Sequence, residues 1–91
     1  MGSKGKERYY IGGFQYIPEE STVLWKSDGI IGTATLYRTE KGSYFKVEES
    51  EDGKKVPEVL TEDRARELMD SYPAGIDLDN YDAVFGEPEK G

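Results

Sequence analysis

The fold is decided by residues 33–50, which read TATLYRTEKGSYFKVEES. β-Branched and aromatic residues are frequent in both halves of this stretch, and Lys41-Gly42 lies between the halves. This pattern is typical of two antiparallel strands joined by a tight turn. We therefore predict a hairpin formed by residues 33–39 and 44–50.

The length of the loop decides which side chains face each other across this hairpin. A two-residue loop pairs Leu36 with Val47 and Arg38 with Phe45. A three-residue loop with a bulge would instead oppose Leu36 to Lys46, so the hydrophobic pattern favours the shorter loop. We expect Leu36, Phe45 and Val47 to share one face of the sheet.

Another hairpin is predicted upstream, around Asp28-Gly29. Both central positions of a type I′ turn need a positive φ, which Asp tolerates and Gly adopts freely. Pairing the flanking strands about this turn places Trp25 opposite Gly32 and Val23 opposite Ala34. Together the two hairpins predict one core face that consists of Val23, Trp25, Ala34, Leu36, Phe45 and Val47.

Two further strands complete the predicted sheet. Residues 9–16 are rich in aromatic side chains, and Gly12-Gly13 marks a bulge or bend within them. Residues 56–60 form a short strand that Pro57 restricts to an edge, because proline cannot donate a backbone hydrogen bond.

One amphipathic helix is predicted over residues 62–72, with Thr61 as its N-cap. Its apolar stripe, spaced i, i+3, i+4 and i+7, consists of Ala65, Leu68, Met69 and Tyr72. Residues 73–86 are expected to be irregular or to form one more short element that closes the core. The resulting fold is α+β, an antiparallel sheet of four to five strands with one amphipathic helix packed on one face.

A chain of 91 residues is enough for one small domain. We expect a flexible N-terminal arm over residues 1–8, the α+β domain over residues 9–86 and a disordered acidic tail over residues 87–91. No stretch resembles a membrane span or the apolar region of a signal peptide. The expected location is therefore cytoplasmic, without membrane contact.

The composition argues against most enzyme classes. The chain has no His and no Cys, so it lacks imidazole bases, thiolate nucleophiles and the usual zinc ligands. The acidic stretch at residues 77–82 departs from a calcium loop, which would need Asp or Asn at Tyr81 and Gly at Asp82. We predict a non-enzymatic protein with no cofactor and no metal.

Nineteen acidic residues against twelve basic ones give a net charge of −7. This balance disfavours direct contact with nucleic acid and favours a protein partner with a basic surface. A row of carboxylates can bind in a Lys/Arg-rich groove in place of nucleic-acid phosphates, because it carries negative charges at similar intervals. The alternative is that these acids only keep the domain soluble. The candidate partner-binding carboxylates are Glu48, Glu49, Glu51 and Asp52.

A second candidate surface is the face of the sheet opposite the predicted core, where Tyr and Thr suit a partly wet protein contact. Its predicted members are Leu24, Thr33, Thr35, Tyr37, Thr39, Tyr44 and Lys46. Tyr37 and Tyr44 are the candidate binding residues, for another protein or for a second copy in a homodimer. The intramolecular alternative is that residues 9–16, or the tail around Tyr81 and Phe85, cover this face.

Residues 35–45, TLYRTEKGSYF, and residues 60–68, LTEDRAREL, resemble a group of small uncharacterised bacterial proteins. These proteins, common on plasmids, prophages and other mobile elements, have a "LYRTKKGxYFL" hairpin followed by a "PLTEEEAxEW" helix. The similarity covers about residues 16–70. It departs at residues 51–55, where the group has a longer Gly-rich insertion, and at Leu68-Met69, where the group often has Trp.

The group offers no catalytic residues that could be assigned to this sequence. The resemblance therefore implies that the gene comes from a mobile element, and it implies no particular chemistry. Small acidic proteins of phages and mobile elements include inhibitors of bacterial defence complexes, anti-CRISPR proteins among them. The resemblance therefore implies a protein-binding inhibitor that acts through its acidic surface on a basic partner. The alternative is a structural or self-associating protein, monomeric or homodimeric, that uses the Tyr/Thr-rich face.

Overall fold

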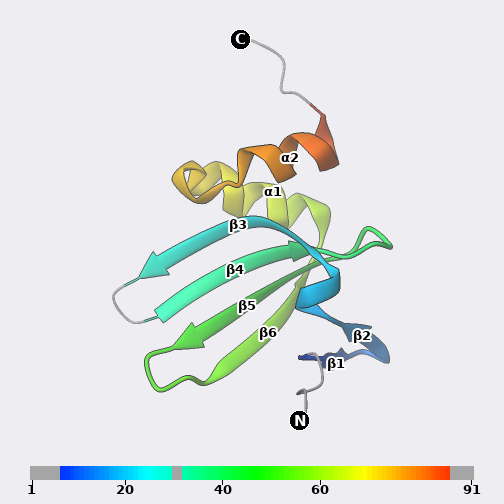
Figure 1. Cartoon of the computed structure of the whole chain (residues 1–91), viewed down its shortest axis with the longest axis vertical. Helices are drawn as coiled ribbons and strands as arrows, with labels where there is room; N and C mark the ends of the chain where they lie inside the picture. Colours follow the sequence, from blue (N-terminus) through cyan, green and yellow to red (C-terminus); the bar gives the residue numbers. More distant parts are fainter. Residues whose placement is uncertain (1–6, 30–31, 87–91) are drawn as a thin grey trace.

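The computed structural model describes residues 7–29 and 32–86, which form a mixed α+β structure (Figure 1). Four strands make an antiparallel sheet in the order β3-β4-β5-β6, and β1 and β2 pair separately. The strands are β1 (Tyr9–Ile11), β2 (Phe14–Tyr16), β3 (Thr22–Gly29), β4 (Gly32–Arg38), β5 (Tyr44–Ser50) and β6 (Lys55–Leu60). The helices are α1 (Glu62–Ser71) and α2 (Leu78–Phe85), with short 3₁₀ turns η1 (Pro18–Glu20) and η2 (Pro73–Gly75).

The predicted α+β class, with a helix packed on an antiparallel sheet, is confirmed. A second helix, α2, forms in the segment that was expected to be irregular or to hold one short element. In the described part of the chain, no helix is both long enough and apolar enough to cross a bilayer. Residues 1–6 of the predicted arm and the predicted tail at residues 87–91 lie outside the described residues.

The β4–β5 hairpin does not have the predicted register. Leu36 pairs with Lys46, so the predicted pairing of Leu36 with Val47 is wrong. The backbone N–H of Thr39 donates to the carbonyl of Ser43 at 2.8 Å, which leaves a three-residue loop. Its last residue, Gly42, has a φ of +91°, the left-handed conformation that such loops require.

The β3–β4 hairpin also differs from its prediction. Gly29 pairs with Gly32 and Trp25 with Leu36, so Asp28-Gly29 belongs to β3 and the predicted pairing of Trp25 with Gly32 is wrong. Val23 pairs with Tyr37 instead of Ala34, beyond a bulge between Val23 and Trp25. Residues 30 and 31, which separate the paired glycines, lie outside the described residues. Burial of Trp25 opposite Leu36 outweighs the local turn preference of Asp28-Gly29.

These registers give the sheet two buried faces. Between one face and the helices lies a cluster of buried residues, to which α1 contributes Ala65 and Met69 and the sheet contributes Leu24, Trp25, Leu36 and Tyr44. The other face carries a second cluster, Tyr16, Phe45 and Val47, with Tyr9, Ile11 and Tyr37 packed against it. Trp25 and Phe45 therefore lie on opposite sides, and the predicted single core face is wrong. The cause is a slip of one residue in the β5 pairing, which moves every side chain of that strand to the other face.

The aromatic stretch at residues 9–16 is a hairpin, where one strand with a bulge or bend was predicted. Gly12 and Gly13 have φ values of +58° and +84° and form its two-residue turn, as a type I′ turn requires. The Tyr16 ring lies 5.4 Å from the Phe45 ring, and the Tyr37 ring stacks on Phe45 at 4.9 Å. The hairpin therefore covers part of the face opposite the helices, which is one of the intramolecular alternatives considered above.

The predicted α1 is confirmed, and it ends at Ser71, one residue before the predicted end. Its N-cap is Thr61, whose hydroxyl accepts a hydrogen bond from the Arg64 backbone N–H at 3.2 Å. Ala65 and Met69 of its apolar stripe are fully buried, whereas Tyr72 is 62% exposed. The edge strand predicted from Pro57 is also confirmed, because β6 is the last strand of the sheet.

The second helix packs on the same face of the sheet as α1. The Phe85 ring of α2 stacks on Tyr44 at 6.3 Å between ring centroids, and Tyr81 also packs against the cluster on that face. The guanidinium of Arg66 lies 4.2 Å from the Phe85 ring centroid, a cation–π contact that joins α1 to α2.

The segment between the helices closes part of the outer edge of β3. Ile76 bridges to Trp25, and the Asp77 backbone N–H donates to the carbonyl of Leu24 at 2.9 Å. The indole Nε1–H of Trp25 donates to the Tyr72 carbonyl at 2.8 Å. A Cβ at Gly75 would overlap the Lys26 carbonyl oxygen and the Trp25 indole. Gly75 therefore permits close contact between η2 and β3.

Replacing Gly75 with Ala is expected to lower the free energy of unfolding by about 1–3 kcal/mol, because the added methyl group has no space against Lys26 and Trp25. The exposed neighbour provides a control, since Ala74→Ser should change it by less than about 0.5 kcal/mol. Urea unfolding of both variants measures the difference. Equal stabilities would contradict the described packing of η2.

Candidate functional site

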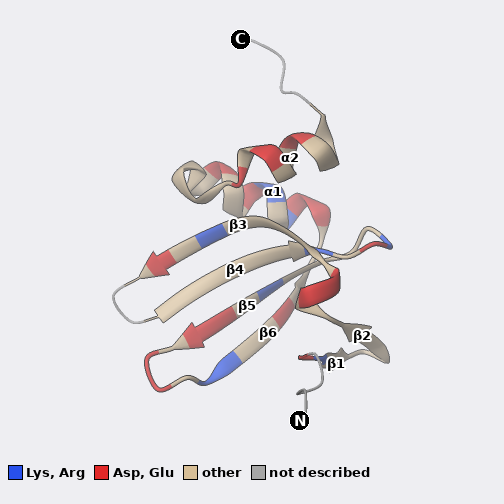
Figure 2. Ribbon diagram, viewed as in Figure 1, with Lys and Arg blue, Asp and Glu red and all other residues tan. Residues whose placement is uncertain are grey.

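The four predicted carboxylates lie together at one corner of the sheet, and we call them the acidic rim: Glu48, Glu49, Glu51 and Asp52. All four are exposed. They lie at the end of β5 and in the turn to β6, as Figure 2 shows. The turn is fixed by backbone hydrogen bonds of 2.9 Å from Ser50 to Lys54 and from Gly53 to Ser50. Local chain geometry therefore brings these four acids to one corner of the sheet, where Glu48 and Glu49 point to opposite faces because they are consecutive in β5.

Asp52 is held in this turn by its own carboxylate. It accepts hydrogen bonds from the Ser50 hydroxyl and from the Lys54 backbone N–H, the latter at 3.1 Å. The hydroxyl of Ser50, followed by the N–H of Lys54, lowers the pKa of Asp52 below its usual 3.8. Asp52 therefore keeps its negative charge to a lower pH than an ordinary aspartate.

Lysines lie among these acids and partly balance them. Lys46 is 3.4 Å from Glu48 and 3.5 Å from Glu58. Lys55 donates to Glu7, a hydrogen bond that raises the pKa of Lys55 and lowers the pKa of Glu7. Five acids and three lysines between positions 46 and 58 leave a local charge of −2.

A hollow of about 500 Å³ adjoins the acidic rim, at the end of the sheet away from the helices. Two cross-strand pairs of small residues, Ser27 with Ala34 and Gly29 with Gly32, lie side by side in its lining. The lining also includes Trp25, Val56, Glu48, Glu49 and Lys54. We call this the open-end hollow. The hollow could not be predicted from the sequence, because its small residues face each other only in the register that the structure shows.

The two helices carry a second concentration of negative charge. Residues 61–86 contain seven acids and two arginines, a net charge of −5. Figure 2 shows acidic residues on both α1 and α2. Trp25, which lines the open-end hollow, also contacts Tyr72 at the end of α1 through its indole N–H. The hollow therefore extends from the acidic rim to Trp25, next to the end of α1.

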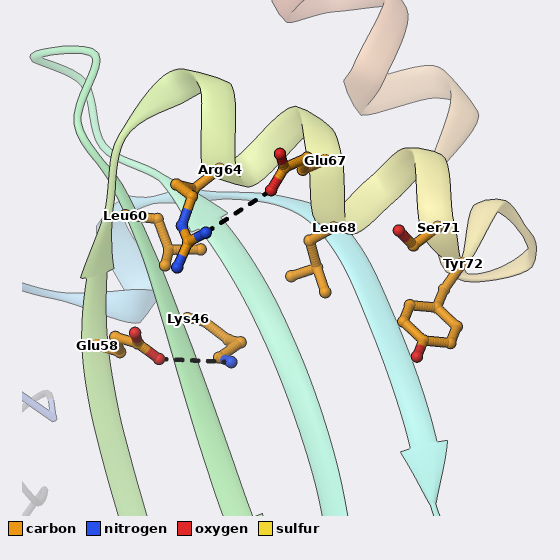
Figure 3. A pocket seen from close by; sticks show the side chains of 8 residues that line it. All are labelled: Lys46, Glu58, Leu60, Arg64, Glu67, Leu68, Ser71 and Tyr72. Carbon is orange, nitrogen blue, oxygen red and sulfur yellow. Dashed lines mark ion pairs between the residues drawn. The ribbon is translucent and has the colours of Figure 1, made fainter.

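A smaller pocket of about 220 Å³ lies between α1 and strands β5 and β6 (Figure 3). Arg64 extends toward it from the helix and Lys46 from the sheet, and the apolar side chains of Leu60 and Leu68 also line it. Arg64 is 3.8 Å from Glu67, and Lys46 pairs with Glu58. Because two cations face two carboxylates, the pocket has no net charge to select an ion of either sign.

Tyr37 and Tyr44, predicted to act together, lie on opposite faces of the sheet. Tyr44 is only 4% exposed and belongs to the cluster under the helices. Tyr37 is half-buried beside Phe45 on the other face, and burial raises its pKa. The predicted grouping of both tyrosines on one Tyr/Thr-rich face is therefore wrong, and the one-residue slip in β5 is again the reason.

Residues 77–82 are mostly part of a helix. Asp77 is the N-cap of α2, and its carboxylate accepts a hydrogen bond from the Asn80 backbone N–H at 3.1 Å. The Asn80 side chain donates to the Val23 carbonyl at 2.8 Å. Within residues 7–29 and 32–86, no three acidic side chains are grouped so that they could hold a metal ion.

No protein-family model, curated protein or solved structure matches this chain. The resemblance to proteins of mobile elements, and the inhibitory function that it implies, therefore stay predictions.

The hydrogen bonds to Asp52 predict its titration. Asp52 should titrate below its usual 3.8, and Ser50→Ala should move its pKa upward, because the hydroxyl that favours the ionised form is removed. The carboxyl chemical shift of Asp52, followed against pH by NMR, measures both values. Ser71→Ala, an exposed change outside this turn, is the control and should leave the curve in place. An unchanged Asp52 pKa in Ser50→Ala would exclude this hydrogen bond as the cause.

Proposed function

We propose that the protein is a small acidic, non-enzymatic protein-binding module that docks its acidic rim onto a basic surface of a partner protein. The observation that carries this proposal is the proximity of four exposed carboxylates at the end of β5 and on the ordered turn that follows it: Glu48, Glu49, Glu51 and Asp52. A fixed turn presents these charges at little entropic cost on binding, which favours recognition of a defined basic surface.

The rest of the charge distribution supports the same function. The net charge of −7 attracts a basic partner from a distance and raises its association rate. The rim adjoins the open-end hollow, and residues 61–86 add a net charge of −5 in the helical part of the chain. A basic partner is therefore attracted by more of the protein than the rim alone.

The alternative surface around Tyr37 and Tyr44 has less support. Tyr44 is buried under the helices, and the β1–β2 hairpin packs beside Tyr37. The tyrosines available for a partner or for a second copy are therefore fewer than the sequence suggested. The acidic rim is the better candidate, because all its members are exposed.

The resemblance to proteins of mobile elements supports a more specific proposal. The partner is a cytoplasmic bacterial defence complex, and the protein blocks a basic groove with which that complex binds nucleic acid. The carboxylates then take the place of phosphates, and the protein, a phage or mobile-element product, is an inhibitor of the anti-CRISPR kind.

Charge reversal tests the proposed function. A nonapeptide of arginine is a defined basic probe, and its affinity for the Glu49→Lys/Glu51→Lys double variant should be about tenfold lower than for the wild type, equivalent to about 1.4 kcal/mol. The reason is that the variant replaces two attractive charges of the rim with repulsive ones. Isothermal titration calorimetry at low salt measures both affinities, and raising the ionic strength should weaken the wild-type complex.

The matched control is Glu19→Lys/Glu40→Lys, which makes the same change in net charge at exposed positions outside the rim. Circular dichroism verifies that both variants are folded. An equal loss of affinity in the two variants would show that net charge alone attracts the peptide. That result would contradict a binding site at the rim.

A further inference from the structure

We infer that the guanidinium of Arg38 binds a carboxylate of the acidic segment at residues 87–91. The two candidate carboxylates are Glu87 and Glu89, and the segment lies outside the described residues. Arg38 lies at the opposite end of β4 and β5 from the acidic rim, so this site is independent of the proposed function.

Arg38 is a partly buried cation without a partner. In the described part of the chain, only two basic residues are partly buried, Arg38 and Lys46. Lys46 pairs with Glu48 and Glu58, whereas Arg38 forms no ion pair with any described residue. Its Nε is buried and has no hydrogen-bond partner among these residues. Because a buried donor of a charged group is costly without an acceptor, an acceptor from the rest of the chain stabilises the fold.

The end of α2 lies close to Arg38. Arg38 pairs with Tyr44 across the sheet, on the face toward the helices, and its guanidinium carbon is 6.0 Å from the centroid of the Tyr44 ring. The Phe85 ring of α2 stacks on the same tyrosine at 6.3 Å between centroids. The Phe85 ring and the guanidinium are therefore at most about 12 Å apart, the sum of these two distances. Since only Gly86 separates Phe85 from Glu87, the acidic segment begins near Arg38.

The segment is long enough to reach the guanidinium. An extended chain spans about 3.3–3.6 Å per residue, so the backbone of Glu87 lies within about 7 Å of the Phe85 Cα and that of Glu89 within about 14 Å. Gly86 ends α2 with a φ of +82°, a left-handed conformation that turns the chain away from the helix axis. Pro88 favours an extended backbone at the residue before it, so the segment loses fewer conformations on binding.

The charges of the segment and of its site are complementary. Residues 87–91 contain two carboxylates, Glu87 and Glu89, and one amine, Lys90. A guanidinium presents its donors in a fixed plane that matches a carboxylate through two parallel hydrogen bonds. An ion pair with Arg38 supplies the missing acceptor and joins the end of α2 to the end of β4.

NMR titration tests the pairing from the side of the glutamates. The carboxyl group that binds Arg38, from Glu87 or Glu89, should titrate at least about 0.5 pH units lower in the wild type than in Arg38→Gln, because the positive charge favours the ionised form. Arg64→Gln, which removes an exposed arginine of α1, is the matched control and should leave both titrations in place. If neither glutamate titrates differently in Arg38→Gln, Arg38 is not the carboxylate site.

A second measurement keeps Arg38 and changes only the segment. Glu87→Gln/Glu89→Gln should speed the hydrogen exchange of the Arg38 Nε–H at least about fivefold, because no carboxylate then holds this proton. The substituted residues lie outside the described fold, so this test serves even if Arg38→Gln does not fold. The matched control, Glu49→Gln/Glu51→Gln, removes the same charge at exposed positions and should exchange as the wild type does. Equal exchange in the wild type and the segment variant would overturn the pairing.

Acetate distinguishes the segment from a carboxylate of another molecule. At constant ionic strength, acetate should shift the Arg38 Nε–H resonance of Glu87→Gln/Glu89→Gln, and it should shift that of the wild type less, because the segment already occupies the site. An equal shift in both proteins would show a site that is open to external carboxylates, and it would exclude residues 87–91 as the occupant.

Discussion

The pairing of Tyr37 with Phe45 across β4 and β5 is the constraint on which the rest of the structure depends. It turns Phe45 toward the β1–β2 hairpin and leaves Leu36 and Tyr44 under the helices. Because side chains alternate along a strand, this one pair assigns every residue of both central strands to a face. Gly42 permits it by taking the left-handed conformation in the loop.

With the faces assigned in this way, the sheet separates two layers of different character. The helices form an acidic layer on one side, and an aromatic hairpin covers part of the other side. The helices leave the rim end of the sheet uncovered, where β3 and β4 carry small residues beside Trp25. The proposed binding function uses this uncovered end, where charge and shape coincide.

Local features could be predicted from the sequence because neighbouring residues determine them. Thr61 as a helix cap and β6 as an edge strand are of this kind. The registers could not be predicted, because apolar residues occur in consecutive pairs such as Leu24-Trp25, Leu36-Tyr37 and Tyr44-Phe45. With such pairs, either register turns large apolar side chains toward the helices. Because consecutive residues point to opposite faces, both residues of a pair are buried only when each face of the sheet is covered. The open-end hollow depends on the register and was missed for the same reason.

Burial on both sides of the sheet also determines which segments of the chain open first. β4 and β5 contribute side chains to both clusters, whereas each covering layer contacts only one face. Opening of the β1–β2 hairpin or of α2 breaks one cluster and leaves the other intact. The amide protons of the two central strands therefore exchange with solvent last, after those of either cover, and they report the global unfolding of the protein.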